Sequence, residues 1–437
     1  MHIRYIDGNR LKRALIAGSH RLMDRAARLN AINVFPVPDG DTGTNMAGTA
    51  RTMVLALQGA SHPGVGATVR MAADSALRGA RGNSGAILAQ FLHGLAEELK
   101  DEARVTTRRF AAAARAAAHR TYQALSQPRE GTILTVLKDW AEATHRLAER
   151  TDDFLVLLRG ALEEARASLA RTTELLPELK KSGLPDAGAE GVVHILEGIM
   201  AFIHRGRIRD LARSRGAGRA EAGDAADAAS RETGADGLAE ADLEGGAFEH
   251  GESAFRYCTE CMALGEGMDL GALRKGLEAL GDSVVVAGSP SLAKIHLHTD
   301  EPTKAFRLIE SHGEIEGQKV DDMELQRRLS ARPRAAAALL ADSACDLPGG
   351  LGLELLVERV PVRVELGGKG YLDRDGLSAD EFYAMLRANP RLATSTSQPA
   401  PAAFQRKFDL LLDNADEAVY VGLSAALSGT LEAGSRA

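Results

Sequence analysis

The sequence has little that would direct the chain out of the cytoplasm or onto a nucleic acid. Its 437 residues include three cysteines, too few for a disulfide scaffold in so long a chain. No stretch approaches the length of an uninterrupted apolar membrane span, and the first residues lack the apolar region of a signal peptide. The net charge of −7 gives no excess of positive charge for nucleic acid or an anionic membrane. We therefore expect a cytoplasmic protein that binds no nucleic acid and has no membrane span.

The common nucleotide-binding motifs are absent as well. The sequence contains no Gly-x4-Gly-Lys-Ser/Thr motif and no Gly-x-Gly-x-x-Gly motif before a helix. Hydrophobic residues make up 45% and charged residues 26% of the chain, as in soluble globular proteins. The length is sufficient for about two to four domains.

The first 205 residues have the apolar spacing of helices throughout. Apolar side chains recur every three to four residues, and the connections are short and marked by glycine or proline. We expect an all-α domain over residues 1–205, with helices at 10–31, 46–57, 106–125, 131–149, 153–171 and 189–204, and another that is opened by the stretch 80–85.

The composition changes abruptly after this domain. Residues 205–219 contain six arginines, and residues 221–252 contain ten acidic residues and a single arginine. Large apolar side chains are almost absent, so burial cannot offset the entropy cost of ordering the segment. We predict a flexible charged linker over 206–252.

Two further domains are predicted after the linker. Over 253–330, short apolar strands alternate with helical segments, which indicates a small α/β domain. Over 335–437, apolar strands at 336–341 and 418–422 are each followed by a loop rich in hydroxyl groups. The predicted architecture is therefore a helical domain followed by two α/β domains.

The most distinctive stretch of the helical domain is the acidic loop at residues 33–46. Asp39 and Asp41 flank a glycine in a segment stiffened by two prolines. Carboxylates two residues apart on a tight turn can converge on one hard cation, and Mg²⁺ is bound by a few carboxylates together with substrate phosphates. Turns of this composition also occur as simple caps of the following helix, so the loop alone does not decide.

A second loop, Gly82-Asn83-Ser84-Gly85, opens the helix that follows it. Unpaired N–H groups and the helix dipole favour a phosphate at such a helix start. Asn83 or Ser84 would serve equally well as an ordinary cap. The loop supports phosphate binding only in combination with the acidic loop.

The middle domain carries side chains that bind metals. His296 and His298 alternate with apolar residues in a predicted strand, so both imidazoles point to one face. Cys258 and Cys261 lie near another predicted strand. One thiolate and two imidazoles, with a water, suit tetrahedral Zn²⁺. Two surface histidines on a half-exposed strand would give the same pattern, and the spacing favours neither interpretation.

Four stretches of the helical domain together resemble the signatures of the DhaL domain, the ATP-binding helical barrel of dihydroxyacetone kinases. The stretches are 33–46, 79–85, 130–134 and 186–191, and the resemblance covers roughly residues 5–205. The form Asn-Val-Phe-Pro-Val-Pro-Asp-Gly-Asp-Thr-Gly is similar to the catalytic subunit of bacterial fatty acid kinases. The resemblance implies an all-α helical barrel.

This resemblance also implies a site for ATP and Mg²⁺. Asp39 and Asp41 would be the catalytic residues and hold Mg²⁺ against the ATP phosphates. Asn33 stands where the dihydroxyacetone kinases have a third aspartate, and its amide would bind Mg²⁺ more weakly. The residues implied to contact the phosphates or lie near the nucleotide are Thr42, Gly43, Thr44, Asn45, Gly82, Asn83, Ser84, Gly85 and Asp186.

The middle domain resembles the middle domain of the catalytic subunits of fatty acid kinases, on residues 257–260, 281–285 and 294–300. The resemblance implies that Cys258, His296 and His298 are zinc ligands.

The third domain resembles the first part of DegV, the fatty-acid-binding partner of these kinases. The matching stretches are 342–347, 396–399 and 427–430. The resemblance implies that the hydroxyls of Thr396 and Ser428 hold the fatty acid carboxylate, with Ser343 as a further candidate. Much of the acyl tunnel is missing, so we expect a fragment or a decayed fusion that does not enclose a lipid tail.

Together these resemblances predict a kinase that uses ATP and Mg²⁺ to convert a fatty acid to an acyl phosphate. We expect a homodimer to which a DegV-type domain, or a separate full-length DegV-type protein, presents the acceptor. One alternative is a kinase for dihydroxyacetone or another small polyol, although the histidine-bearing substrate domain of those enzymes has no match. The other is a nucleotide- and lipid-binding regulator without catalysis.

Overall fold

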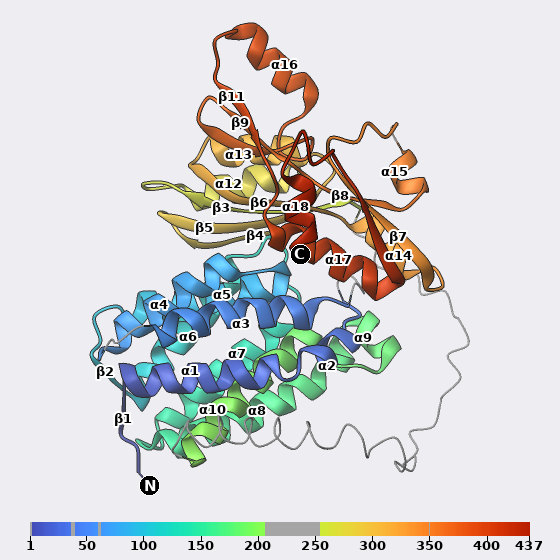
Figure 1. Ribbon diagram of the computed structural model, residues 1–437. Helices are drawn as coiled ribbons and strands as arrows, with labels where there is room; N and C mark the ends of the chain where they lie inside the picture. Colours follow the sequence, from blue (N-terminus) through green and yellow to red (C-terminus); the bar gives the residue numbers. More distant parts are fainter. Residues whose placement is uncertain (1, 36–39, 60–62, 206–253, 349) are drawn as a thin grey trace. The chain divides into compact units, whose positions relative to one another are not determined.

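The computed structural model describes residues 2–35, 40–59, 63–205, 254–348 and 350–437 (Figure 1). The chain forms two compact units, one of residues 1–122 and 128–252, the other of residues 123–127 and 253–437. The predicted linker lies outside the described residues. Among the residues that are described, no helix combines the length and the apolar character needed to cross a membrane.

The first unit is built of helices, as the sequence predicts. Its helix α1 packs along α10, α4 along α5, and α7 along α8 (Figure 1). The closed barrel stays a prediction. The helices are α1 (Gly8–Met23), α2 (Ala26–Ala31), α3 (Thr42–Gln58), α4 (Val65–Gly79), α5 (Gly82–Leu99), α6 (Thr107–Gln123), α7 (Ile133–Ala148), α8 (Phe154–Leu175), α9 (Pro177–Ser182) and α10 (Ala187–Arg205).

Two short strands correct the all-α prediction for this unit. β1 (Tyr5–Asp7) and β2 (Arg104–Thr106) pair antiparallel, with Ile6 opposite the buried Val105. Strands of three residues are too short for an alternating apolar pattern to be recognised. The single helix predicted over 10–31 is also wrong, because the chain turns between α1 and α2.

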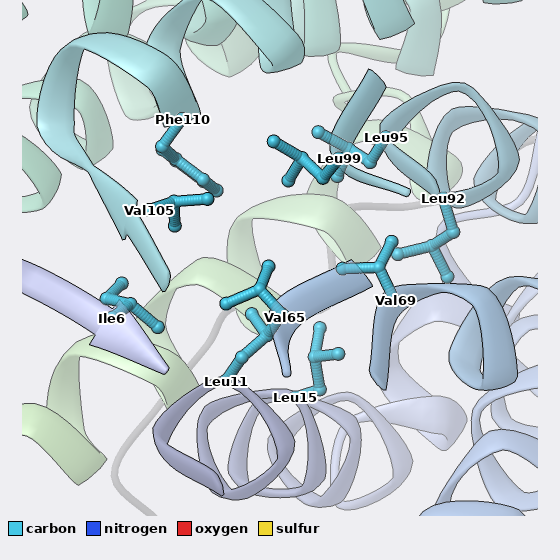
Figure 2. Close-up of a pocket in the computed structure, with 10 residues that line it drawn as sticks. All are labelled: Ile6, Leu11, Leu15, Val65, Val69, Leu92, Leu95, Leu99, Val105 and Phe110. Carbon is cyan, nitrogen blue, oxygen red and sulfur yellow. The ribbon is translucent and has the colours of Figure 1, made fainter. Parts of the chain in front are cut away.

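A small apolar cavity lies inside the helical unit, next to the two strands (Figure 2). Its volume is about 20 Å³, and its lining offers no polar surface. Such a volume would hold one water molecule, but without a polar partner we expect it to stay dry. It is too small for a fatty acid chain. The lining residues are Ile6, Leu11, Leu15, Val65, Val69, Leu92, Leu95, Leu99, Val105 and Phe110.

The middle module of the second unit is a βαββαβ fold. Its strands form an antiparallel sheet in the order β4-β5-β3-β6. Helices α12 and α13 pack on one face of this sheet through a core that includes Leu273, Leu277 and Phe306. The elements are β3 (Tyr257–Leu264), α12 (Leu270–Glu278), β4 (Gly281–Ser289), β5 (Leu292–Thr299), α13 (Pro302–Glu310) and β6 (Glu314–Asp322), followed by α14 (Met323–Ser330).

The third module holds two small sheets. One is parallel, in the order β12-β7-β8, and the other is antiparallel, in the order β10-β9-β11. The strands predicted at 336–341 and 418–422 correspond to β7 and β12. The elements are β7 (Ala335–Asp342), α15 (Leu351–Glu354), β8 (Val357–Val360), β9 (Arg363–Leu366), β10 (Lys369–Leu372), α16 (Ala379–Ala388), β11 (Thr394–Ser397), α17 (Pro401–Asn414), β12 (Ala415–Val421) and α18 (Thr430–Ser435).

Ion pairs join the middle and third modules within the second unit. Lys407 of α17 lies 3.1 Å from Asp321 of β6 and 2.8 Å from Glu358 of β8. At the end of α13, Glu310 accepts hydrogen bonds from Lys369 and from the hydroxyl of Tyr371. The two modules therefore form one compact body.

Candidate functional site

The first turn of α3 carries four of the residues implied to contact phosphates. α3 begins at Thr42, so Thr42 to Asn45 form a helical turn rather than the loop that the sequence suggested. Asp41 precedes this turn, and within the described residues its carboxylate makes no capping hydrogen bond to it. The alternative, in which the acidic loop simply caps the following helix, therefore does not hold for the side chain of Asp41.

Two asparagines hold this turn in place. Asn30 accepts a hydrogen bond from the N–H of Thr44 (3.0 Å) and donates one to its hydroxyl (2.9 Å). Asn33, only 5% exposed, accepts a hydrogen bond from the hydroxyl of Thr42 at 2.9 Å. One lone pair of Asn33 is thus already used, and its role as a magnesium ligand stays a prediction. Asp39 lies outside the described residues.

Glycines at the starts of α5 and α10 allow these helices to contact α3 and α5, respectively. Gly82 has a φ of +57°, and a Cβ on it would lie 2.7 Å from Nδ2 of Asn45 on α3. A Cβ on Gly188, in the first turn of α10, would lie 2.6 Å from Oγ of Ser84 on α5. The first turns of three helices therefore meet. Because helix starts carry unpaired N–H groups and partial positive charge, this meeting point favours a polyanion.

Asp186 ties a fourth helix start to the same place. Its carboxylate is 5% exposed, and it accepts hydrogen bonds from the N–H groups of Ala189 (2.7 Å) and of Ile133, the first residue of α7. Burial raises the pKa of Asp186 to about 6, although both hydrogen bonds act in the opposite direction. Asp186 therefore lies next to the starts of α7 and α10, and its place near a nucleotide stays a prediction.

Glu130 fixes the loop that leads into α7. Its carboxylate accepts hydrogen bonds from Thr135 and Lys138, both at 2.6 Å, and from the hydroxyl of Tyr122 at 3.1 Å. The hydroxyl of Thr135 in turn accepts the N–H of Gly131 at 2.8 Å. The start of α7, and with it the N–H that reaches Asp186, is held from the solvent side.

Asn83 has an orphaned acceptor in this region. Its Oδ1 is buried and has no hydrogen-bond partner in the part of the chain that the structure describes. The oxygen and nitrogen of an amide are exchanged by a flip, so the same position can offer a donor. A buried amide oxygen without a partner, next to Ser84, is consistent with a ligand contact from Asn83.

Replacement of Asp186 by asparagine should stabilise the helical unit at high pH. The folded pKa of about 6 exceeds the unfolded value of about 3.9, so the ionised carboxylate costs stability as pH rises from 4 through 6. The pKa difference corresponds to a cost of about 3 kcal/mol in the free energy of unfolding of the wild-type protein. This cost is fully present above pH 7 and absent below pH 4, and asparagine removes it. Trp140, the single tryptophan, lies in α7. Urea unfolding followed by its fluorescence at pH 4 and pH 8 measures the effect, and an equal difference at both pH values would contradict it.

Cys258, His296 and His298 lie together on one face of the middle sheet. Their ligand atoms are all within 4.8 Å of one another, and His298 lies opposite Cys258 in the β3–β5 ladder. Nε2 of His296 and Nδ1 of His298 are buried without a hydrogen-bond partner among the described residues. Sγ of Cys258 lies 3.8 Å from Nδ1 of His296. Buried polar atoms are normally paired, so two imidazoles that each have an unpaired nitrogen, gathered with a thiol, fit a metal with nitrogen and sulfur ligands. Cys261 belongs to the apolar core instead, where burial raises its pKa to about 12.

Charged side chains surround this cluster. Glu260 contacts His296, Lys294 and Lys319, and Asp282 lies 3.5 Å from His298. Lys294 is two residues before His296, so strand alternation could have placed it on this face. Lys319 and Asp282 come from other strands and leave no local signal. Asp300, which follows β5, accepts the N–H of Arg256.

Only some of the residues predicted to bind the fatty acid carboxylate lie close together in the third module. Thr396 lies on the exposed strand β11, whereas the hydroxyl of Ser428 lies 2.7 Å from that of Thr430. Gln398 and Gly429 are in contact, which brings the two stretches together. Ser343 is buried, and its hydroxyl accepts the N–H of Val362 at 3.0 Å. That hydrogen bond holds the link between β8 and β9, so the geometry around Ser343 is explained without a ligand.

Three segments of the chain match known protein families. Residues 36–201 match the DAK2 domain, and residues 254–330 match the FakA-like middle domain of fatty acid kinases. Residues 336–437 match the uncharacterised proteins of the DegV family. The three segments correspond to the three folded modules described above.

Curated relatives share the greater part of the chain. Protein YloV of Bacillus subtilis is 34% identical over 330 residues, which is 75% of this chain and 57% of that protein. An uncharacterized protein of Staphylococcus saprophyticus is 33% identical over 328 residues, or 74% of this chain and 56% of its own length. The chain thus spans little more than half the length of these relatives.

Solved structures resemble single parts of the chain. A fatty-acid-binding DegV family protein from Thermus thermophilus is 34% identical over 23% of this chain and 35% of that chain, with a TM-score of 0.22. The dihydroxyacetone kinase of C. freundii is 20% identical over 43% of this chain and 33% of that chain, with a TM-score of 0.36.

Proposed function

We propose that this chain, which combines a DAK2 domain, a FakA-like middle domain and a DegV-family segment, is an ATP-dependent kinase that phosphorylates a fatty acid. The carboxylate oxygen would attack the γ-phosphorus of ATP, the bond to the bridging oxygen of ADP would break, and the products would be an acyl phosphate and ADP. The observation that supports this proposal most is the meeting of helix starts at Asn45, Ser84 and Asp186.

The residues of the helical unit fit the demands of phosphoryl transfer. The N–H groups at the starts of α3 and α5 would hold the phosphates, and the side chains of Asn45 and Ser84 would orient them. Asp41, together with Asp39, would bind Mg²⁺, which neutralises phosphate charge when bound. A fatty carboxylate is already ionised at pH 7, so the site needs no strong general base.

We also propose that the acceptor reaches this site on a DegV-type acyl-binding protein. The third module presents Thr396 on an exposed strand and has Ser343 engaged with the backbone. A separate full-length DegV-type protein would present the acceptor, and a homodimer of the kinase would offer two such sites.

ATP turnover with Mg²⁺ and a long-chain fatty acid tests this function. We expect ADP formation that requires the fatty acid and is increased by an added intact DegV-type protein. The same assay with dihydroxyacetone in place of the fatty acid tests the alternative acceptor. Turnover with dihydroxyacetone alone, or none with any acceptor, would overturn the proposal.

Zinc is the second proposed cofactor, held by Cys258, His296 and His298. Protein stripped with a chelator should regain about one zinc per chain, whereas Cys258→Ser protein should not, because a neutral hydroxyl replaces the thiolate ligand. Cys345→Ser is the matched control, since Cys345 is a free cysteine outside the cluster. The zinc content of the wild-type, Cys258→Ser and Cys345→Ser proteins is measured by mass spectrometry. Equal zinc in all three would contradict the proposed site.

A further inference from the structure

Arg81 directly precedes the glycine turn that opens α5. Its backbone is extended, with a φ of −133° and a ψ of 140°, and its side chain makes no capping hydrogen bond to the helix. The next residue, Gly82, lies against Asn45 of α3. Arg81 is therefore fixed next to the point where the helix starts meet, and the first turn of α5 does not use its guanidinium group.

The side chain of Arg81 lies across α3. A Cβ on Gly48 would lie 3.5 Å from Cδ and Nε and 3.6 Å from Cζ of Arg81. Gly48 follows the exposed Thr44 by four residues, so the two share one face of the helix. The guanidinium group therefore lies one helical turn, roughly 6 Å along the axis, from the turn implied to contact phosphates.

Arg81 is a half-buried arginine without a carboxylate partner. In the described part of the helical unit, three other arginines are half-buried, and each pairs with a glutamate. The pairs are Arg21 with Glu197 (3.2 Å), Arg70 with Glu97 (2.5 Å) and Arg109 with Glu102 (2.8 Å). The guanidinium group of Arg81 makes no hydrogen bond and no ion pair to the described residues. A cation that is partly removed from water is costly without an anion, so an anionic ligand is the expected partner.

Arg81 also carries the full positive charge closest in sequence to the meeting helix starts. Residues 41–46, 81–86 and 185–189 contain no other lysine or arginine, whereas they contain Asp41 and Asp186. Each helix start contributes a partial positive charge of about 0.5. Because a triphosphate carries several negative charges and the proposed Mg²⁺ is itself bound by carboxylates, the site requires a further cation.

We propose that Arg81 binds the phosphates of ATP and stabilises the negative charge of the phosphoryl group during transfer. This inference rests on the proposed function and adds the cation of its phosphate site. Rotation about the side-chain bonds of Arg81 moves the guanidinium group from Gly48 along α3 to phosphates at Thr44 and Asn45. Its fork of N–H donors then pairs with two phosphate oxygens at once, which a single ammonium group does less well.

Turnover of an Arg81→Gln variant tests the role of this charge. With Mg²⁺, a long-chain fatty acid and a full-length DegV-type protein, we expect its kcat/KM for ATP to fall about a thousandfold, as for other arginines at a transferred phosphate. Arg81→Lys keeps the charge and should regain about tenfold over Arg81→Gln. Arg51→Gln is the matched control, because Arg51 is an exposed arginine of α3 and its loss changes the net charge equally. The proposal is overturned if Arg81→Gln matches the control, or if Arg81→Lys is no better than Arg81→Gln.

Affinity for ATP with Mg²⁺, without an acceptor, separates this inference from the proposed function. Isothermal titration should give a dissociation constant about 10- to 100-fold higher for Arg81→Gln than for Arg51→Gln. The urea midpoint, followed by the fluorescence of Trp140, should be the same in both variants, since Arg81 has no partner to lose among the described residues. Equal affinities would overturn the role of Arg81. Wild-type protein that binds ATP but phosphorylates no fatty acid would overturn the proposed function alone, and wild-type protein that does not bind ATP would overturn both.

Discussion

Replacement of Asp41 by asparagine should lower ATP turnover by about a thousandfold and leave the chain folded. Asp41 directly precedes α3, and in the described residues its carboxylate makes no capping hydrogen bond to that helix. Asparagine is about as favourable as aspartate at a helix N-cap, so the substitution should cost α3 little. The same loss should remove one of the two carboxylates proposed to bind Mg²⁺, so that charge on the phosphates is no longer neutralised during transfer.

Asp101→Asn is the control for this substitution. Asp101 is an exposed carboxylate of the same unit, in the turn after α5. Its replacement should change neither turnover nor unfolding. Initial rates of ADP formation over a range of Mg²⁺ concentrations separate the two cases, since Asp41→Asn protein should stay inactive even at high Mg²⁺. If Asp41→Asn protein turns over ATP as the Asp101→Asn protein does, the magnesium assignment is wrong.

Two glycines of α3 should respond to alanine in opposite directions. A Cβ on Gly43 would lie 2.0 Å from the backbone oxygen of Ala26 in α2. Because backbone cannot move aside as a flexible side chain can, we expect Gly43→Ala to destabilise the helical unit by about 3 kcal/mol. A Cβ on Gly48 would meet only Arg81, at an ordinary distance of 3.5 Å. Gly48→Ala should stabilise the helix by about 0.5–1 kcal/mol, since alanine has less conformational freedom to lose.

This pair separates a packing requirement from helix propensity, because both substitutions add one methyl group to the same helix. Urea unfolding followed by the fluorescence of Trp140 reports on the unit that contains both glycines. Gly43→Ala should also weaken ATP binding, since the turn that it distorts carries Thr44 and Asn45. Equal changes of stability in the two variants would show that α2 and α3 do not approach as closely as the structure indicates.

Local patterns predicted the parts of the site that lie within a few residues of one another. Alternation along a strand predicted that His296 and His298 share a face, and the structure places them there with Cys258. The stretch Gly82-Asn83-Ser84-Gly85 predicted a helix start there, and α5 begins at Gly82. These signals are readable because their geometry is fixed by the backbone of a single element.

Partners from distant segments could not be predicted in this way. Lys319 reaches Glu260 because β6 pairs with β3. The contact between Gly188 and Ser84 joins α10 to α5 across about one hundred residues of sequence. Even the start of α3 at Thr42, four residues before the predicted Met46, follows from hydrogen bonds that Asn30 makes to Thr44.

The sequence by itself therefore determined which chemical groups this protein possesses, because motif composition and period are local properties. It indicated a helical module with an acidic loop, a module with a thiol and two imidazoles, and a hydroxyl-rich third module. Tertiary structure decided which groups meet. The convergence of four helix starts around Asp186, and the contacts of Glu260 with Lys294 and His296, arise from packing between segments far apart in the chain. Such contacts depend on the burial of whole helix and sheet faces, and no short stretch of sequence encodes them.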